Sequence, residues 1–326
     1  GPVASTLLPV TTAGDSDISR WTDPAWLAEV RSWTDHHLAR LGLHRTADPT
    51  QPHLRSWATA LRVPTSGGVV WFKASQESLA HEAAVVELLA RRAPEHVRPL
   101  LAADTGRGWM LMEDAGERLR ELVVAEASLQ RWHKVLDAAA RISLAVEDDV
   151  EALLALGVPD GRLPTLVDGW DALMDELDAA ARFREAREQV ASLANALAAY
   201  EIRETLQHDD LHDGQVFVRD GRHWVIDWGD AVVSHPFFVL AVVLEGQLAW
   251  GLDDVEDSID TAPFRDTFLR PYAEAYPHLT QGDLVEAAQL ATRLGWAARA
   301  VNGHLPDHPG HTTARLEMFV DGRTSA

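Results

Sequence analysis

The sequence predicts an α+β protein of two unequal lobes: a small β-rich lobe with one helix, then a larger, mostly helical lobe that carries a β-hairpin. The chain of 326 residues is longer than a single core usually supports. Runs of β-branched and aromatic residues gather in the first third, whereas helical periodicity dominates after residue 119 and one hairpin pattern interrupts it near residue 220. We therefore expect a first domain over residues 1–112, a second over residues 113–326, and a cleft between them.

Composition excludes several classes of function. Acidic residues outnumber basic ones 50 to 29, giving a formal net charge of −21, which disfavours nucleic acid and anionic membranes as partners and favours cationic ones. Cysteine is absent, so disulfides, thiolate zinc sites and cysteine nucleophiles are excluded. The apolar run 237–244 is too short to span a bilayer, and residues 1–17 lack the pattern of a signal peptide. We expect a cytoplasmic protein without a membrane segment; its oligomeric state stays open.

The elements of the small lobe follow from local signals. Asp23 suits the position before a helix, Pro24 suits its first position, and Gly42 suits its end. The stretch "PTSGG" between two β-rich runs predicts a hairpin. In chain order we expect a helix over 23–42, a loop over 44–53, a hairpin that closes on a strand over 69–74, a helix capped by Ser78 that ends before Pro94, and a strand over 108–112.

The large lobe is predicted to be helical over 119–206, over 235–251 and from 263 onward, with a break at "GVPDGRLP". Between these helices "VFVRDGRHWVID" contains Asp-Gly between two β-rich runs, the strongest hairpin signal in the chain. A two-residue turn there pairs Arg219 with Arg222, and this register places Gln215 beside Asp227 at the open end. Asp210 precedes the same end by a few loop residues.

Two carboxylates and an amide oxygen are thus expected to converge, and such hard oxygen ligands suit Mg²⁺. Two alternatives compete. The acids of "HDDLHDG" are also typical of turns. His208 and His212 stand four residues apart, as in the zinc motif H-E-x-x-H, but that motif requires a helix, which the neighbouring acids and glycine disfavour here.

The segments "HDDLHDGQVFV" and "VIDWGDA" resemble the aminoglycoside phosphotransferase family, whose members have a two-lobed, protein-kinase-like fold. The family pattern H-G-D-x-H-x-x-N matches at His208, Asp210 and His212. The resemblance implies that Asp210 is the catalytic acid that orients the acceptor hydroxyl, that His208 braces the loop, and that Gln215 and Asp227 hold Mg²⁺. Two residues depart from the pattern: Asp209 replaces glycine, and Gln215 replaces the metal-binding asparagine.

The resemblance also implies a nucleotide-binding small lobe. Lys73 lies on the expected strand "VVWFKAS" and would bind the nucleotide phosphates, paired with a glutamate of the next helix. Glu82 shares a face with apolar residues and is chosen over Glu77 and Glu87. Glu113 belongs to the linker whose backbone would receive the adenine.

The expected activity is transfer of the γ-phosphoryl group of ATP or GTP, with Mg²⁺, to a hydroxyl of a small molecule. Aminoglycoside-like antibiotics, amino sugars and other cationic alcohols are the candidate acceptors, and antibiotic resistance is a candidate role. The alternative from another class is a nucleotide-binding pseudokinase, in which Asp209 and Gln215 reflect lost turnover.

Overall fold

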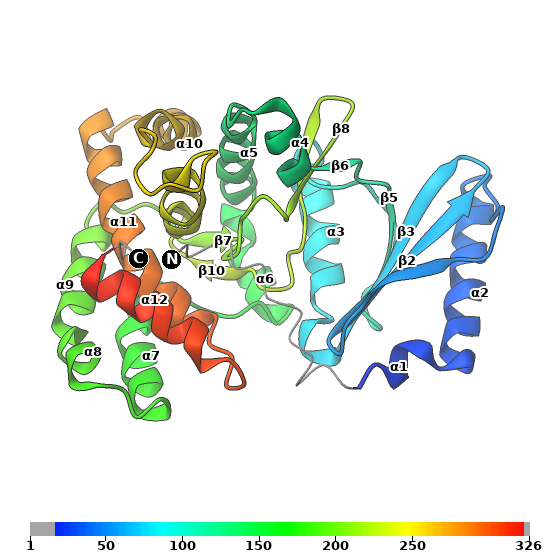
Figure 1. Ribbon diagram of the computed structural model, residues 1–326, viewed down its shortest axis with the longest axis horizontal. Helices are drawn as coiled ribbons and strands as arrows, with labels where there is room; N and C mark the ends of the chain where they lie inside the picture. Colours follow the sequence, from blue (N-terminus) through cyan, green and yellow to red (C-terminus); the bar gives the residue numbers. More distant parts are fainter. Residues whose placement is uncertain (1–16, 323–326) are drawn as a thin grey trace. The chain divides into compact units, whose positions relative to one another are not determined.

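A computed structural model describes residues 17–322 (Figure 1). The chain divides into two compact units: an N-terminal unit that extends to Gly116 and a C-terminal unit that begins at Glu117. The expectation about a signal peptide falls almost entirely outside the described residues. Between residues 17 and 322, no helix combines the length and apolarity that a membrane crossing requires.

The N-terminal unit is built on a five-stranded antiparallel sheet with strand order β1-β2-β3-β5-β4. Its elements are α1 (Ser19–Thr22), α2 (Pro24–Arg40), β1 (Thr50–Leu54), β2 (Ala58–Thr65), β3 (Gly68–Ser75), the 3₁₀ turn η1 (Glu77–Leu79), α3 (Glu82–Arg92), β4 (Leu100–Asp104) and β5 (Trp109–Glu113). Figure 1 shows α2 along one face of the sheet and α3 along the other.

The alternation of β3 explains how the two faces differ. Phe72 is fully buried against α2, where its ring contacts Trp26 and Trp33. The next residue, Lys73, points to the opposite face, because successive side chains of a strand alternate. The sheet therefore buries an aromatic core on one side and presents a single ammonium group toward α3.

The ends of α2 follow the sequence prediction. The Asp23 carboxylate accepts a hydrogen bond from the Trp26 N–H at 3.0 Å, Pro24 opens the helix, and Gly42 has a φ of +74° just after it. Two other predictions were wrong. Ser78 lies inside η1, and α3 begins only at Glu82, because the chain forms a 3₁₀ turn first. The predicted loop over 44–53 contains the start of β1, since this stretch finds backbone partners on β2.

The C-terminal unit is mostly helical, with a three-stranded sheet of order β6-β8-β9 and the antiparallel pair β7-β10. Its elements are β6 (Glu117–Arg118), α4 (Leu119–Glu126), α5 (Arg131–Ala145), η2 (Glu147–Asp149), α6 (Val150–Ala155), α7 (Leu163–Glu176), α8 (Ala181–Glu185), α9 (Arg187–Ala198), β7 (Thr205–Gln207), β8 (Val216–Arg219), β9 (Arg222–Val225), β10 (Val232–Ser234), η3 (Pro236–Phe238), η4 (Ala241–Gln247), η5 (Leu248–Trp250), α10 (Ala262–Ala275), α11 (Gln281–Asn302) and α12 (Pro309–Asp321). The predicted hairpin register is confirmed, because Arg219 pairs with Arg222.

The apolar run that follows β10 is helical, as predicted, but it is not a regular α-helix. It forms a 3₁₀ turn in η3, a π-helix in η4 and a second 3₁₀ turn in η5. Periodicity could not reveal this, because an almost continuous apolar run has no polar face to define the helical pitch. Single π-helical turns are rare and frequently accompany functional sites.

Candidate active site

The strand topology of the C-terminal unit brings two loops to the same end of its paired strands. One loop, residues 208–215, connects β7 to β8, and the other, residues 226–231, connects β9 to β10. Because β8 pairs with β9 and β7 pairs with β10, both loops leave from paired strands. The residues that the sequence singled out, from His208 to Asp227, all lie on these two loops.

His208 joins the two loops. Its buried imidazole donates from Nε2 to the carbonyl oxygen of Ile226 at 2.6 Å, and its Nδ1 accepts from the Asp210 N–H at 3.3 Å. Burial lowers the pKa of His208, which keeps the ring neutral and so leaves Nδ1 able to accept. His208 therefore fixes the backbone of Asp210 relative to the residue that precedes Asp227.

Asp210 has an arginine and a histidine as neighbours. Its Oδ1 forms an ion pair with a guanidinium nitrogen of Arg299, and its Oδ2 lies 3.6 Å from Nε2 of His212. Burial alone raises the pKa of Asp210, but the neighbouring His212 ring and the charge of Arg299 outweigh it and hold this pKa below its usual range. The carboxylate is therefore ionised, partly exposed, and restrained through one oxygen.

Asp209, which replaces the glycine of the family pattern, turns back toward β7. Its N–H donates to Oε1 of Gln207 at 2.9 Å, and its Oδ1 accepts from Nε2 of the same side chain at 2.9 Å. Burial, the largest influence, raises the pKa of Asp209 to about 6, although the Arg299 charge opposes it. Asp209 thus has a local bonding partner of its own, and at neutral pH its carboxyl is still mostly ionised.

Gln215 and Asp227 lie next to each other, as the hairpin register predicted. Nε2 of Gln215 donates to Oδ2 of Asp227 at 2.8 Å, and the Gln215 carbonyl accepts from the Ile226 N–H at 2.9 Å. Asp227 has a φ of +65°, a conformation that few residues other than glycine adopt and that often marks functional positions. The pair offers a carboxylate and an amide oxygen, the kinds of ligand that Mg²⁺ takes.

Asp213 is held by two elements beyond the loop. Its carboxylate accepts from Arg120 of α4 at 2.8 Å, and its N–H donates to Oε1 of Gln247 in the π-helix at 3.2 Å. Gly214 follows, and an added Cβ there would lie 2.8 Å from the His212 ring. The turn between Asp210 and Gln215 is therefore closely packed.

Two residues of the cluster were missed by sequence reasoning. Arg299 of α11 and Arg315 of α12 come from the C-terminal helices, and both act electrostatically on Asp209 and Asp210. Nothing local marks them, because arginine is common in this chain and Arg299 lies 89 positions from Asp210 in sequence. Only the packing of α11 against the loop 208–215, and of α12 against α11, identifies them.

The N-terminal unit contributes an ion pair of its own. Nζ of Lys73 on β3 lies 2.8 Å from Oε2 of Glu82 in the first turn of α3, and the Glu82 side chain is 4% exposed. At the end of β5, the Glu113 N–H donates to the Pro99 carbonyl at 3.1 Å, and the Glu113 carbonyl accepts from Nε of Arg98 at 2.6 Å.

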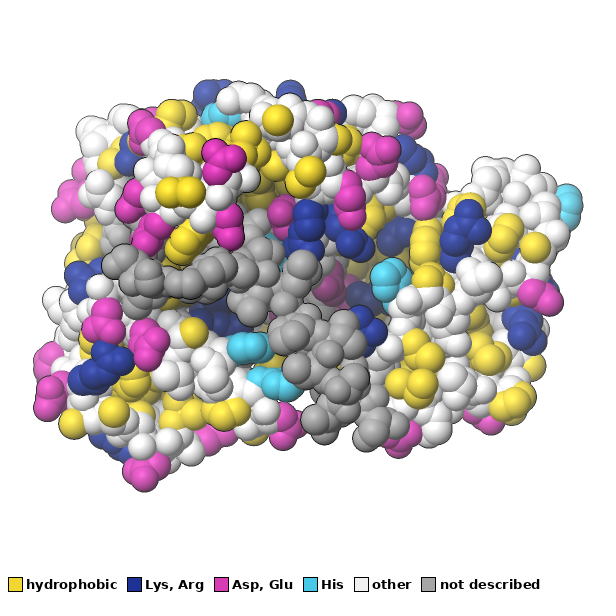
Figure 2. All heavy atoms as spheres, in the orientation of Figure 1, with side chains coloured by type: hydrophobic (Ala, Val, Ile, Leu, Met, Phe, Trp, Pro, Cys, Tyr) yellow, Lys and Arg dark blue, Asp and Glu magenta, His cyan; other side chains and the backbone are white. Residues whose placement is uncertain are grey.

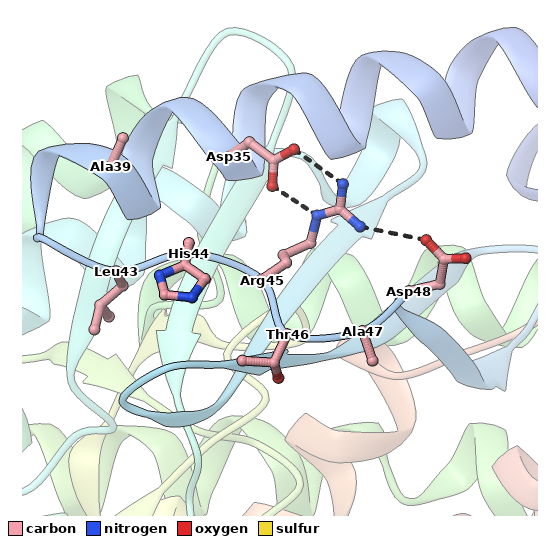
Figure 3. Close-up of a pocket in the computed structure, with 8 residues that line it drawn as sticks. All are labelled: Asp35, Ala39, Leu43, His44, Arg45, Thr46, Ala47 and Asp48. Carbon is pink, nitrogen blue, oxygen red and sulfur yellow. Dashed lines mark hydrogen bonds and ion pairs between the residues drawn. The ribbon is translucent and has the colours of Figure 1, made fainter.

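Each unit also has a surface hollow. The one in the N-terminal unit measures about 510 Å³ and contains none of the predicted site residues (Figure 3). Arg45 crosses it, held by Asp35 at 2.6 Å and Asp48 at 3.4 Å, so its charge is already compensated. The hollow in the C-terminal unit measures about 430 Å³ and lies along β6, α4 and β8, where Phe217 and Leu122 line it.

The geometry does not support the zinc alternative. The segment around His208 and His212 is not helical, and both rings already bond to nearby backbone groups. In the part of the chain from 17 to 322, no three His, Asp or Glu side chains come together as a metal site.

Acidic side chains are spread widely over the face shown in Figure 2, with basic ones among them, so no single acidic patch marks a binding site there.

A five-stranded antiparallel sheet with a Lys–Glu pair to one helix, followed by a mostly helical unit in which Asp210 and Asp227 lie on two loops at the same end of paired strands, is the arrangement of a small-molecule kinase of the protein-kinase-like fold. The sequence agrees with this class. The chain belongs to the phosphotransferase enzyme family, whose sequence model matches residues 60–285.

Solved structures show the same fold at low identity. The chain is similar to macrolide 2′-phosphotransferase MphH from Brachybacterium faecium (19% identity, TM-score 0.55, 87% of this chain and 98% of that one). It is also similar to a choline/ethanolamine kinase family protein from Mesorhizobium loti (12%, 0.57, 91% and 92%) and to a thermostable mutant of aminoglycoside phosphotransferase APH(4)-Ia in complex with AMP-PNP and hygromycin B (17%, 0.55, 90% and 99%). No curated protein sequence matches the chain significantly.

Proposed function

We propose that the protein transfers the γ-phosphoryl group of ATP or GTP, with Mg²⁺, to a hydroxyl group of a small molecule. One observation carries this proposal. Asp210, ionised and restrained, lies at the same end of the paired strands as Gln215 and Asp227, which are hydrogen-bonded to each other. A base for the acceptor and two hard oxygen ligands are the parts that phosphoryl transfer requires.

In the proposed reaction, Asp210 accepts a hydrogen bond from the acceptor hydroxyl and orients its oxygen toward the γ-phosphorus. A bond forms between that oxygen and phosphorus, the bond to the β-phosphate oxygen breaks, and the hydroxyl proton passes to Asp210. His208 and Arg299 hold the Asp210 loop still, so their contribution is orientation, which is the main source of catalysis in this class.

Each unit has groups that suit a nucleotide. Lys73, kept in place by Glu82, would neutralise phosphate charge, and the Glu113 carbonyl would accept from the base. Phe217 on β8 follows Gln215, the residue just before that strand, by two positions and so shares its face. This supports the hollow beside Phe217 as the place for the apolar part of the nucleotide. Gln215 and Asp227 would hold Mg²⁺, which supplies charge neutralisation on the phosphates when bound.

The acceptor class rests on charge and on similarity. A net charge of −21 favours cationic acceptors, and the similar solved proteins are named for macrolides, aminoglycosides and choline or ethanolamine. Asp213 is an acid of the same loop, but Arg120 already compensates its charge. We therefore do not expect Asp213 to bind a cationic acceptor. If the acceptor is an antibiotic, cytoplasmic expression of the protein should raise the antibiotic concentration that a bacterial host survives.

The experiment is a measurement of ADP or GDP release from each nucleotide with a panel of aminoglycosides, macrolides, amino sugars, choline and ethanolamine, followed by mass spectrometry of the acceptor. Wild-type protein should phosphorylate at least one compound, and Asp210→Asn should not. Asp220→Asn, an exposed aspartate at the far end of the same hairpin, is the matched control and should retain activity. Nucleotide binding without transfer to any compound would instead favour the pseudokinase alternative.

A further inference from the structure

Arg299 is the strongest contact of the catalytic aspartate outside its own loop. The side chain of Arg299 is 14% exposed, while that of Asp210 is 30% exposed, and their ion pair joins α11 to the loop between β7 and β8. An arginine that is mostly buried and paired through one carboxylate oxygen is more restrained than a surface ion pair. The pair therefore fixes the position of Oδ1.

Arg299 is itself held at the end of its helix. Its carbonyl accepts from the Gly303 N–H at 2.9 Å and from Nη1 of Arg315 at 3.4 Å, and the same Arg315 nitrogen donates to the Gly303 carbonyl at 2.8 Å. An added Cβ at Gly303 would lie 2.6 Å from that nitrogen and 2.9 Å from the Arg299 carbonyl. Arg315 of α12 thus holds the end of α11 at the residue that contacts Asp210.

The charges around the guanidinium are balanced. Asp210, Asp209 and Asp230 act on it favourably, whereas Arg315 is a neighbouring positive charge. A lysine could supply the same charge from a flexible stem, but the planar guanidinium loses less side-chain entropy for each hydrogen bond that it makes. Arginine therefore suits a group that must hold a carboxylate in one orientation.

We infer that Arg299 is a positioning residue for phosphoryl transfer: it restrains Asp210 through Oδ1, so that Oδ2, on the side of His212, is the oxygen presented to the acceptor hydroxyl. The inference rests on the proposed function for its catalytic meaning. It assigns a role to Arg299 of helix α11, a residue that lies beyond the residues 60–285 matched by the family model.

The kinetic test compares Arg299→Gln, Arg299→Lys and the control Arg293→Gln, which lies on the exposed side of the same helix. Loss of orientation should lower kcat of Arg299→Gln by about 100-fold while the KM for nucleotide stays close to the wild-type value. Arg299→Lys should recover part of kcat, and Arg293→Gln should resemble wild type. Wild-type kcat in Arg299→Gln, or a rise in nucleotide KM without a fall in kcat, would overturn the inference.

A second test does not depend on activity. The free energies of unfolding of Arg299→Gln, Asp210→Asn and the double variant form a cycle that measures the coupling of the two side chains. We expect the double variant to be more stable than the sum of the single losses implies, because each single change leaves a partly buried charge without its main counter-charge. Additive losses would overturn the pairing. If wild type phosphorylates nothing but the cycle shows coupling, the proposed function fails while the restraint of Asp210 by Arg299 stands.

Discussion

At the scale of single residues, Asp209 shows how a departure from the family pattern is accommodated. Its φ of +67° is the left-handed conformation that glycine adopts most readily, and aspartate is one of the few other residues that tolerate it. The two hydrogen bonds with Gln207 compensate for this conformation. The substitution therefore preserves the turn that places Asp210, and it gives no structural reason to expect lost turnover.

The two lysines of the chain provide a matched pair of variants. Lys73→Met should lower kcat/KM for the nucleotide by about 10²–10³-fold, because it removes a preorganised charge that neutralises phosphate. Lys134→Met, an exposed position on α5, should leave kcat/KM unchanged. Steady-state nucleotide consumption measures both, and an equal effect of the two variants would remove Lys73 from the nucleotide site.

At the scale of secondary-structure elements, the end of α11 depends on a glycine. Gly303→Ala should lower the free energy of unfolding by about 1–3 kcal/mol, because the added methyl group overlaps the Arg299 carbonyl and the Arg315 guanidinium. Gly310→Ala is the control, since its Cβ would meet no atom within 4 Å. Urea denaturation compares the two; a stability loss of similar size in both variants would contradict the packing described here.

The turn η3 makes stability depend on pH. Nδ1 of His235 accepts from the Phe237 N–H at 3.1 Å, and burial among aromatic rings lowers the pKa of His235 to about 3. The unfolded chain takes up a proton near pH 6.5 that the folded chain cannot bind, so this residue destabilises the fold increasingly as pH falls from 6.5 toward 3.

His235→Asn should weaken that dependence, because asparagine can accept the same N–H but does not titrate. Between pH 7 and pH 5, the wild-type protein should lose about 2 kcal/mol more of its unfolding free energy than the variant does. Chemical denaturation at both pH values gives the comparison, in which every other titrating group is shared. Parallel pH curves for the two proteins would show that His235 does not stay neutral.

At the scale of the whole molecule, the sequence predicted what short-range signals encode. The Asp-Gly turn determined the hairpin register and hence the meeting of Gln215 and Asp227, and the β3 pattern indicated Lys73. Contacts over long sequence separations were not predictable. Arg299 reaches Asp210 only because α11 packs against the loop 208–215, and β7 and β10 are too short to show a pattern before they pair.

Ligand binding should be visible in the stability of the whole chain. With Mg²⁺, the correct nucleotide at 100 times its Kd should add about 2.7 kcal/mol to the unfolding free energy, and the midpoint temperature should rise by several degrees. Asp227→Asn should lose the part of this rise that requires Mg²⁺. Thermal unfolding with ATP and with GTP identifies the preferred donor, and no rise with either would leave the nucleotide site without support.

The scarcity of lysine has a practical consequence for labelling. The side-chain amines of the chain number two: Lys134 is exposed, whereas Lys73 is 22% exposed and bound to Glu82. An acylating reagent should therefore modify Lys134 quickly and Lys73 slowly, and a bound nucleotide should slow only the second reaction. The ratio of the two modified peptides would report site occupancy directly, with an internal standard that the chain itself supplies.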